Sequence, residues 1–472
     1  QMMSNQLNST SVLVFSYIGY ETREETVGSR RSIDVNLEAE QMMLDELVVI
    51  GYGSAKKRNV LGAVTKVDAL ELNQLPVASI DQALQGRAAG VQVTQNTGAP
   101  GEGVSVRIRG AGSLNSSNAP LYIVDGMPTV DALKVLSPAD IESISVLKDA
   151  SAAAIYGSRA NNGIVLITTK KGSTGKVKIS YNGQFGYQKA INLTPMVNTA
   201  DYITAYNEAA TNDNLYLPES LRRQLITSED AAKFADVNHL KELLRTAPVT
   251  SHELSVSGGN ENSDYIISTS LFDQKGIIKN TGYTRGTARI DVNTKVNKWL
   301  TAGISMLVGV SDNDIIGSSG DGYGGNGGSV VRYAFFRNPA IPVRFDDGTF
   351  VDRPAEYFGA QIFDSFLGDG YNPVGMAEYN ENNQKSDSYL GKAYFKAQIT
   401  KDLNFTTNFG LDYRNTSARR FNRTWGTDNR INARNGLSVS NERLDNLTMN
   451  NFFNYEKTIS DVHNFSAMLG FE

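Results

Sequence analysis

The sequence has no cysteine, and its 472 residues include only 2 tryptophans, 3 histidines and 12 prolines. Without cysteine the chain cannot form disulfides, thiolate nucleophiles or cysteine metal sites, which fits an oxidising envelope compartment. Long apolar runs are also missing, because no stretch reaches the roughly 18 apolar residues of a membrane-spanning helix. The net charge of −5 excludes a general attraction to nucleic acid.

Residue types that carry out catalysis are scattered along the chain. His239, His252 and His463 are far apart, and neither H-E-x-x-H nor G-x-S-x-G occurs. A G-x-G-x-x-G motif begins at Gly322, but it lacks the preceding strand and the following helix that a dinucleotide site needs. We therefore expect no enzyme, no cofactor and no metal site.

Polar and apolar residues alternate along most of the chain after Gly172. Between residues 176 and 187 the odd positions from Val177 to Tyr187 are mostly apolar, whereas the even positions are mostly polar. The same period recurs in TARIDVNTKV, WLTAGISMLVGV, LGKAYFKAQI and LNFTTNFGLDY. A period of two gives each strand one apolar and one polar face. Many of these runs reach the roughly 9–11 residues with which a tilted strand crosses a bilayer.

Two long irregular stretches, around residues 198–247 and 311–384, interrupt the alternating segments, which are otherwise joined by short turns. Short turns on one side and long excursions on the other are typical of outer-membrane barrels. A soluble β-sandwich or lectin would alternate in the same way. The pattern favours a mainly β protein with a transmembrane antiparallel β-barrel, of which we count about nine strands.

The sequence before Gly172 has a different pattern of secondary-structure signals. Residues 54–172 alternate short strands with short helical segments, one of which starts at Ser137 to Asp140, and form an α/β unit with its own core. Residues 1–41 read as the end of a small β domain. Residues 42–53 lie between these two units, and residues 173–472 hold the barrel strands and their long loops.

In the segment MLDELVVIGYG, from Met43 to Gly53, two acids are followed by a short β-branched apolar run that ends at Gly-Tyr-Gly. These features predict an extended strand. Its neighbourhood is polar, and no obvious sheet is available to complete, so we expect the strand to be unpaired.

Three arginines of the α/β unit have two open interpretations. Arg107 and Arg109 share one face of the strand VRIRG, and Arg159 follows later. In a free domain these side chains would form a solvated face. Inside a polar lumen they could pair with acids of the surrounding wall.

Several segments together resemble the SusC/RagA family of TonB-dependent outer-membrane transporters of Bacteroidetes. They are LDELVVIGYG, ALQGRAAGVQV, VRIRGAGSLNSSNAPLYIVDGMP and DIESISVLKDASAAAIYGSRANNGIVLITTKKG. The likeness runs in order from about residue 11 to 310. It implies the end of a carboxypeptidase-regulatory-like domain (1–41), a TonB box with its hinge (42–53), an N-terminal α/β plug domain (54–172) and the first part of a barrel (173–472).

The resemblance also implies roles for residues. Strand addition to the periplasmic partner TonB would use the backbone of this segment. The expected TonB-binding residues are Leu44, Asp45, Glu46, Leu47, Val48, Val49 and Ile50. Gly51 and Gly53 would form the hinge, and Arg107, Arg109 and Arg159 the plug–barrel ion pairs. A plugged lumen needs about 22 strands, so we expect the chain to cover the first half of the transporter.

The family implies import of large nutrients, most simply oligosaccharides, across the bacterial outer membrane. TonB with the ExbB–ExbD complex would supply the energy, a SusD-like surface lipoprotein would cover the external loops, and outer-membrane lipid would surround the barrel. Two alternatives remain open: an oligopeptide importer of the same family, and a surface glycan-binding β-protein that transports nothing. A signalling receptor would need an extra N-terminal domain.

Overall fold

The computed structural model describes residues 12–15, 23–26, 33, 35–36, 47–50, 53–56, 64–68, 84–94, 98–101, 104–108, 110, 117–130, 135–148, 154–316, 329–359, 366–367, 371–424, 434–459 and 463–472. Among these residues no helix is both long enough and apolar enough to span a membrane.

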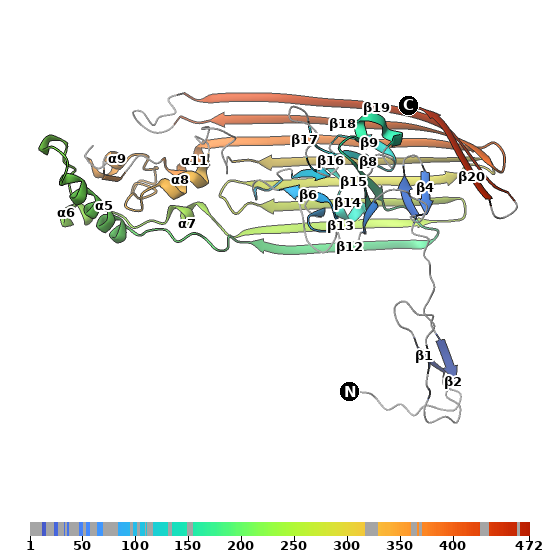
Figure 1. The fold of residues 1–472 in the computed structure, drawn as a ribbon, viewed down its shortest axis with the longest axis horizontal. Helices are drawn as coiled ribbons and strands as arrows, with labels where there is room; N and C mark the ends of the chain where they lie inside the picture. Colours follow the sequence, from blue (N-terminus) through green and yellow to red (C-terminus); the bar gives the residue numbers. More distant parts are fainter. Residues whose placement is uncertain are drawn as a thin grey trace.

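Nine antiparallel strands, each paired with the next along the chain, form one large curved sheet (Figure 1). This number agrees with the nine strands that the alternation predicts. The strands are β12 (Gly175–Gln188), β13 (Ala247–Gly259), β14 (Ser263–Lys275), β15 (Gly282–Lys295), β16 (Leu300–Asp314), β17 (Asn380–Gln398), β18 (Leu403–Asn422), β19 (Gly436–Ile459) and β20 (His463–Phe471).

The two faces of this sheet, the wall, differ as the alternation predicts. Large apolar side chains on one face are exposed, including Val177, Ile179, Tyr181, Phe185 and Tyr187 of β12, all more than half exposed. Ile267, Ile290, Ile304 and Phe409 of other strands are exposed in the same way. The opposite face carries buried polar residues such as Ser268, Thr287 and Asn408. An apolar outer surface and a polar inner surface are what a lipid-embedded barrel needs.

The connections at the two ends of the wall are unequal. Turns of a few residues join β13 to β14, β15 to β16 and β17 to β18 at one end. The connections β12–β13 and β16–β17, at the other end, carry helices α5 (Thr199–Asn214), α6 (Ser228–Ala231), α7 (His239–Leu243), α8 (Val330–Phe336), α9 (Pro354–Phe358) and α11 (Pro373–Tyr379). Figure 1 shows these helices gathered beyond that end of the wall.

These helices and their connections form one outer cap with two apolar cores. Ile226 from the first connection packs with Ile341, Val351 and Phe366 from the second. Leu240 and Leu243 likewise pack with Ala334 and Met376. Phe366 is therefore buried, although its position in a long loop suggests an exposed interface residue. The described parts of the two connections are held together by the apolar side chains that they bury against each other.

A second sheet lies against the inner face of the wall (Figure 1). It has five strands in the order β5 (Val64–Asp68), β10 (Ile141–Leu147), β11 (Ile164–Thr169), β8 (Leu121–Val124) and β9 (Met127–Thr129). Strands β8 and β11 are parallel, and the other pairs are antiparallel. Short 3₁₀ helices at Pro138–Asp140 and Ala154–Ala160 flank β10. This unit is the plug.

Three further hairpins complete the described chain. They pair β1 (Val12–Phe15) with β2 (Arg23–Thr26), β3 (Leu47–Ile50) with β4 (Gly53–Lys56), and β6 (Val91–Thr94) with β7 (Ser105–Ile108). The assignment of residues 1–41 to a separate domain stays a prediction.

Candidate functional site: the plug–wall interface

The plug has an apolar core of its own. Fully buried side chains such as Ile144, Val165 and Leu136 come from the plug itself. A second cluster, around Ile123, Leu147 and Ile164, also contains plug residues alone. The wall contributes to the first cluster only Leu307, which is buried, and Leu390, which is partly buried. The plug therefore keeps most of its hydrophobic stabilisation when its contact with the wall changes.

Hydrogen bonds also join the plug to the wall. Ser137 Oγ donates a hydrogen bond to Glu253 Oε1 at 3.0 Å, and Ser268 Oγ of the wall donates to Asp140 Oδ1 at 2.5 Å. The Val130 amide donates to Asp412 Oδ2 at 3.2 Å. Ser137 precedes a 3₁₀ helix yet makes no side-chain cap there, because its hydroxyl binds the wall instead.

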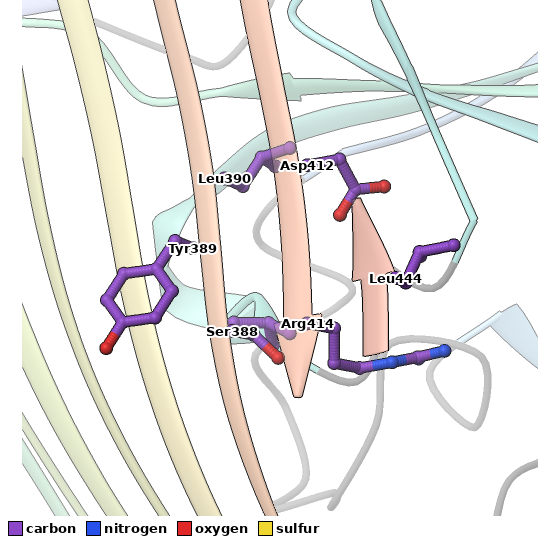
Figure 2. Close-up of a pocket in the computed structure, with 7 residues that line it drawn as sticks. Ser388, Tyr389, Leu390, Asp412, Arg414 and Leu444 are labelled. Atoms are coloured by element: carbon purple, nitrogen blue, oxygen red, sulfur yellow. The ribbon is translucent and has the colours of Figure 1, made fainter. Parts of the chain in front are cut away.

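Figure 2 shows a small pocket where β17, β18 and β19 face the plug, and Asp412, Arg414, Ser388 and Leu390 line it. Tyr389, between two of these residues, points to the opposite side of the strand (Figure 2). The pocket has a volume of about 10 Å³. A space of this size holds at most one water, so the plug fits closely against the wall here.

Two wall glycines allow this close fit. A Cβ atom at Gly309 would lie 2.3 Å from Val135 Cγ1, and one at Gly410 would lie 1.7 Å from Met127 Cε. Met127 can move its flexible end, whereas the branched Val135 cannot do so easily. The Gly309–Val135 contact is therefore the tighter constraint on the plug's position.

A buried polar cluster joins the plug turn at Asp125 to strands β15 and β17. Arg289 Nη2 donates to Thr169 Oγ1 at 2.6 Å, and Lys392 Nζ donates to the Asp125 carbonyl at 2.5 Å. Arg289 also pairs with Asp291 at 3.4 Å, and both side chains are almost fully buried. Nothing in the local sequence distinguishes these residues from others on the polar face of an alternating strand.

The arginines named from the sequence take different positions. Arg159 pairs with Glu472, the residue that follows β20, with Nη2 2.5 Å from Oε1, and its role as a plug–barrel ion pair stays a prediction. Arg107 lies exposed on β7, and no ion pair with the wall is seen for it in the described part of the chain. Arg109 lies outside the described residues.

The expected TonB-binding segment is only partly described. Leu47, Val48, Val49 and Ile50 form a strand as predicted, but the strand is paired, with Val48 opposite Ala55 and Ile50 opposite Gly53. The expectation of an unpaired strand is therefore wrong. Gly53 is the first residue of β4, and the hinge role of Gly51 and Gly53 stays a prediction. Only two residues separate the strands, and a hairpin needs no more than that. Leu44, Asp45, Glu46 and Gly51 lie outside the described residues.

The outer cap contains a buried charged group of its own. Arg337 is fully buried and donates from Nη1 to the Asp352 carbonyl and from Nη2 to the Val351 carbonyl, at 2.7 and 2.6 Å. Burial, and then the Arg337 charge, lowers the pKa of His239 to about 4. Burial, and then the Glu356 carboxylate, raises the pKa of Asp352 to about 6. His239 is therefore neutral in the folded cap at neutral pH.

These two groups give the cap opposite pH dependences. The contribution of His239 is complete above its ordinary pKa of 6.5 and is lost as the pH falls towards about 4. Asp352 binds its proton more tightly in the folded cap, so it adds stability as the pH falls from about 6 towards 3.8. Acidification should therefore stabilise the cap in His239→Gln and destabilise it in Asp352→Asn. Limited proteolysis between pH 7 and 4 measures the stability of the cap in both variants. Equal pH profiles in the two variants would contradict the opposite pKa shifts of His239 and Asp352.

Comparison with known proteins identifies these parts. Residues 56–164 match the family described as TonB-dependent Receptor Plug Domain. TonB-dependent receptor P39 of Formosa agariphila is 36% identical over 470 residues, which cover 98% of this chain and 41% of P39. TonB-dependent receptor SusC of Bacteroides thetaiotaomicron is 37% identical over 290 residues, 60% of this chain and 27% of SusC. The RagAB peptide importer in its open-open state aligns over 90% of this chain and 48% of the importer chain, with a TM-score of 0.75 and 27% identity.

The chain belongs to the SusC/RagA family of TonB-dependent receptors. As a SusC/RagA protein it resides in the bacterial outer membrane, and its mainly β fold consists of a plug and a partial barrel, as the sequence predicts. The chain spans less than half the length of these relatives. No group of three or more His, Cys, Asp or Glu residues that could hold a metal ion occurs within the described ranges.

Proposed function

We propose that the full-length protein actively imports oligosaccharides across the outer membrane and that TonB, energised by ExbB–ExbD, supplies the work. The observation that carries this proposal is the way in which the plug is held. It has its own apolar core, and hydrogen bonds link it to the wall. Water can replace hydrogen bonds when such an interface opens, so a pull can displace the plug without unfolding the barrel.

TonB would exert this pull by binding the segment from Leu44 to Ile50. Strand addition uses backbone hydrogen bonds, and a strand in a two-stranded hairpin keeps one edge available for a new partner. Strand β3 has this arrangement, because β4 occupies a single edge. Either TonB adds to the remaining edge or it replaces β4.

The inner face of the wall supports a sugar as the substrate. Its side chains are mainly neutral hydrogen-bonding groups rather than charged or apolar ones. They include Ser180, Asn182, Gln184, Ser255, Ser268, Ser270, Thr287, Ser305, Ser388, Thr406, Asn408, Thr416 and Asn450. Hydroxyl and amide groups match the hydroxyls of an oligosaccharide without selecting for charge.

A second candidate substrate is an oligopeptide, which the structural similarity to the RagAB peptide importer supports. Both candidates include a SusD-like lipoprotein over the outer cap as the partner. We assign no enzymatic step to the protein in either case. A surface glycan-binding protein without transport is the less favoured alternative, because it would need no separately folded plug.

Uptake by a deletion strain that carries the restored gene tests the proposal. We expect the gene to restore uptake of fluorescent neutral oligosaccharides and not of labelled oligopeptides of similar size. An uncoupler should abolish this uptake and leave binding at the cell surface intact, because binding needs no energy. Peptide uptake alone would favour the second candidate, and uptake that persists with the uncoupler would contradict energy coupling.

A further inference from the structure

One contact between the plug and the wall is built differently from the others. Strands β8 and β9 are joined by Asp125 and Gly126, whose φ angles are 48° and 84°. Positive φ at both positions is the geometry of a type I′ turn, which Asp-Gly sequences favour. The Asp125 carboxylate accepts hydrogen bonds from the amide and the hydroxyl of Thr169, at 3.0 and 2.6 Å. The plug thus holds this turn rigidly at the ends of two neighbouring strands.

The wall meets this rigid turn with two cations. Lys392 Nζ donates to the Asp125 carbonyl at 2.5 Å, and Arg289 Nη2 donates to the Thr169 hydroxyl at 2.6 Å. Thr169 therefore uses its hydroxyl for both partners, accepting from the wall and donating to Asp125. Hydrogen bonds to charged donors are about twice as strong as neutral ones.

The wall side of the cluster is itself fixed in position. Arg289 pairs with Asp291, whose Oδ1 accepts from Asn293 Nδ2 at 2.9 Å. Asn293 also donates to Asp264 and accepts from Tyr394, each at 2.9 Å. Side chains from three wall strands, β14, β15 and β17, therefore orient Arg289, so little of its side-chain entropy is lost on docking.

A small cavity beside this cluster has room for water. A cavity of about 20 Å³ lies beside it, lined by Asp125, Thr169, Arg289, Ser305 and Lys392 among others. This volume admits about one water molecule, and the buried Arg289 Nη1 has no protein acceptor, so it could donate to that water. A water molecule at the edge of the cluster can replace the hydrogen bonds between the plug and the wall one at a time.

The geometry points to a latch: Arg289 and Lys392 of the wall, acting on Thr169 and the Asp125 turn, are positioning residues that hold the plug in its seat. This latch must open before the plug can move, whereas the plug's own core stays intact. The inference rests on the proposed function only in that the plug moves during import. Its test measures plug docking directly and needs no substrate.

These 472 residues contain no cysteine, so an introduced thiol is the sole labelling site once any cysteine in the rest of the full-length protein is replaced by serine. Ser137 is buried and faces Glu253 of the wall, so a cysteine there reports undocking. Ala160 is buried within the plug's own second core, so a cysteine there reports plug unfolding. The modification rates of Ser137→Cys and Ala160→Cys by a maleimide are compared in the purified full-length transporter.

In the Ser137→Cys protein, Lys392→Met and Arg289→Met should each speed thiol modification by about tenfold or more, because a charged hydrogen bond is lost. The matched control is Lys396→Met, on the same strand and the same face, which should leave the rate unchanged. In the Ala160→Cys protein none of the three changes should matter. Unchanged labelling at residue 137 would overturn the latch. A parallel rise at residue 160 would also overturn it, since these residues would then support plug folding rather than docking.

Discussion

A disulfide between residues 135 and 309 is expected to stop import completely. A Cβ atom at Gly309 would lie 3.6 Å from Val135 Cβ. Natural disulfides have Cβ atoms about 3.5–4.5 Å apart, so Val135→Cys with Gly309→Cys should oxidise readily. The bond would join plug to wall at a close contact and prevent the movement that opens the lumen. Uptake by the oxidised variant should fall to the level of a deletion strain and return after treatment with a reductant.

The control for this variant contains a disulfide that does not join the plug to the wall. Thr301→Cys with Lys396→Cys places both thiols on the wall, because these residues are register partners on β16 and β17, near the end with the short turns and away from Val135. This variant should import normally whether oxidised or reduced. Normal uptake by a fully cross-linked 135–309 variant, confirmed by mass spectrometry, would show that the lumen opens without movement of this part of the plug.

The strands of the wall could be predicted from the sequence because one side of the wall requires apolar side chains and the other side requires polar ones. Lipid requires Ile267, Ile304 and Phe409 on the outside, while the plug and water require residues such as Ser268 and Asn408 on the inside. Each strand therefore carries the pattern within its own sequence. Strand number and the positions of the two long connections follow from that local pattern.

The contacts that dock the plug could not be predicted in the same way. Arg289 and Thr169 are 120 residues apart, and Lys392 and Asp125 are 267 apart. Each of these side chains is an ordinary polar residue in its own segment. Their meeting depends on the strand register of the wall and on the depth of the plug within it. Among the described residues, Arg159 is the arginine named from the sequence that pairs with an acid beyond the plug, Glu472.

The strand pairing of the N-terminal segment could not be predicted from the sequence either. Its β-branched residues Val48, Val49 and Ile50 predict a strand, and a strand is present. Its partner GSAK has no strand-forming pattern of its own. A strand of low β propensity can pair because it is close in the chain. The sequence pattern therefore does not reveal the pairing of β3 with β4.

Deletion of Leu44 to Ile50 is expected to abolish uptake while the barrel remains inserted and surface binding persists. The segment precedes the plug sheet, which starts at Val64, and pairs only with β4 in the described structure, so its loss should leave the docked plug in place. Removing it would remove the backbone that TonB grips.

Point variants at Val48 separate the loss of the strand from the loss of a side chain. Val48→Pro should reproduce the deletion, because proline lacks the backbone donor and is excluded from paired strand interiors. Val48→Thr keeps the donor and a high β propensity, so it should import at nearly the normal rate. Growth on the transported nutrient, compared with surface binding of the same nutrient, distinguishes the three variants. Normal growth of the deletion strain would exclude this segment as the point of energy coupling, whereas failure of Val48→Thr would show that TonB reads the side chain as well as the backbone.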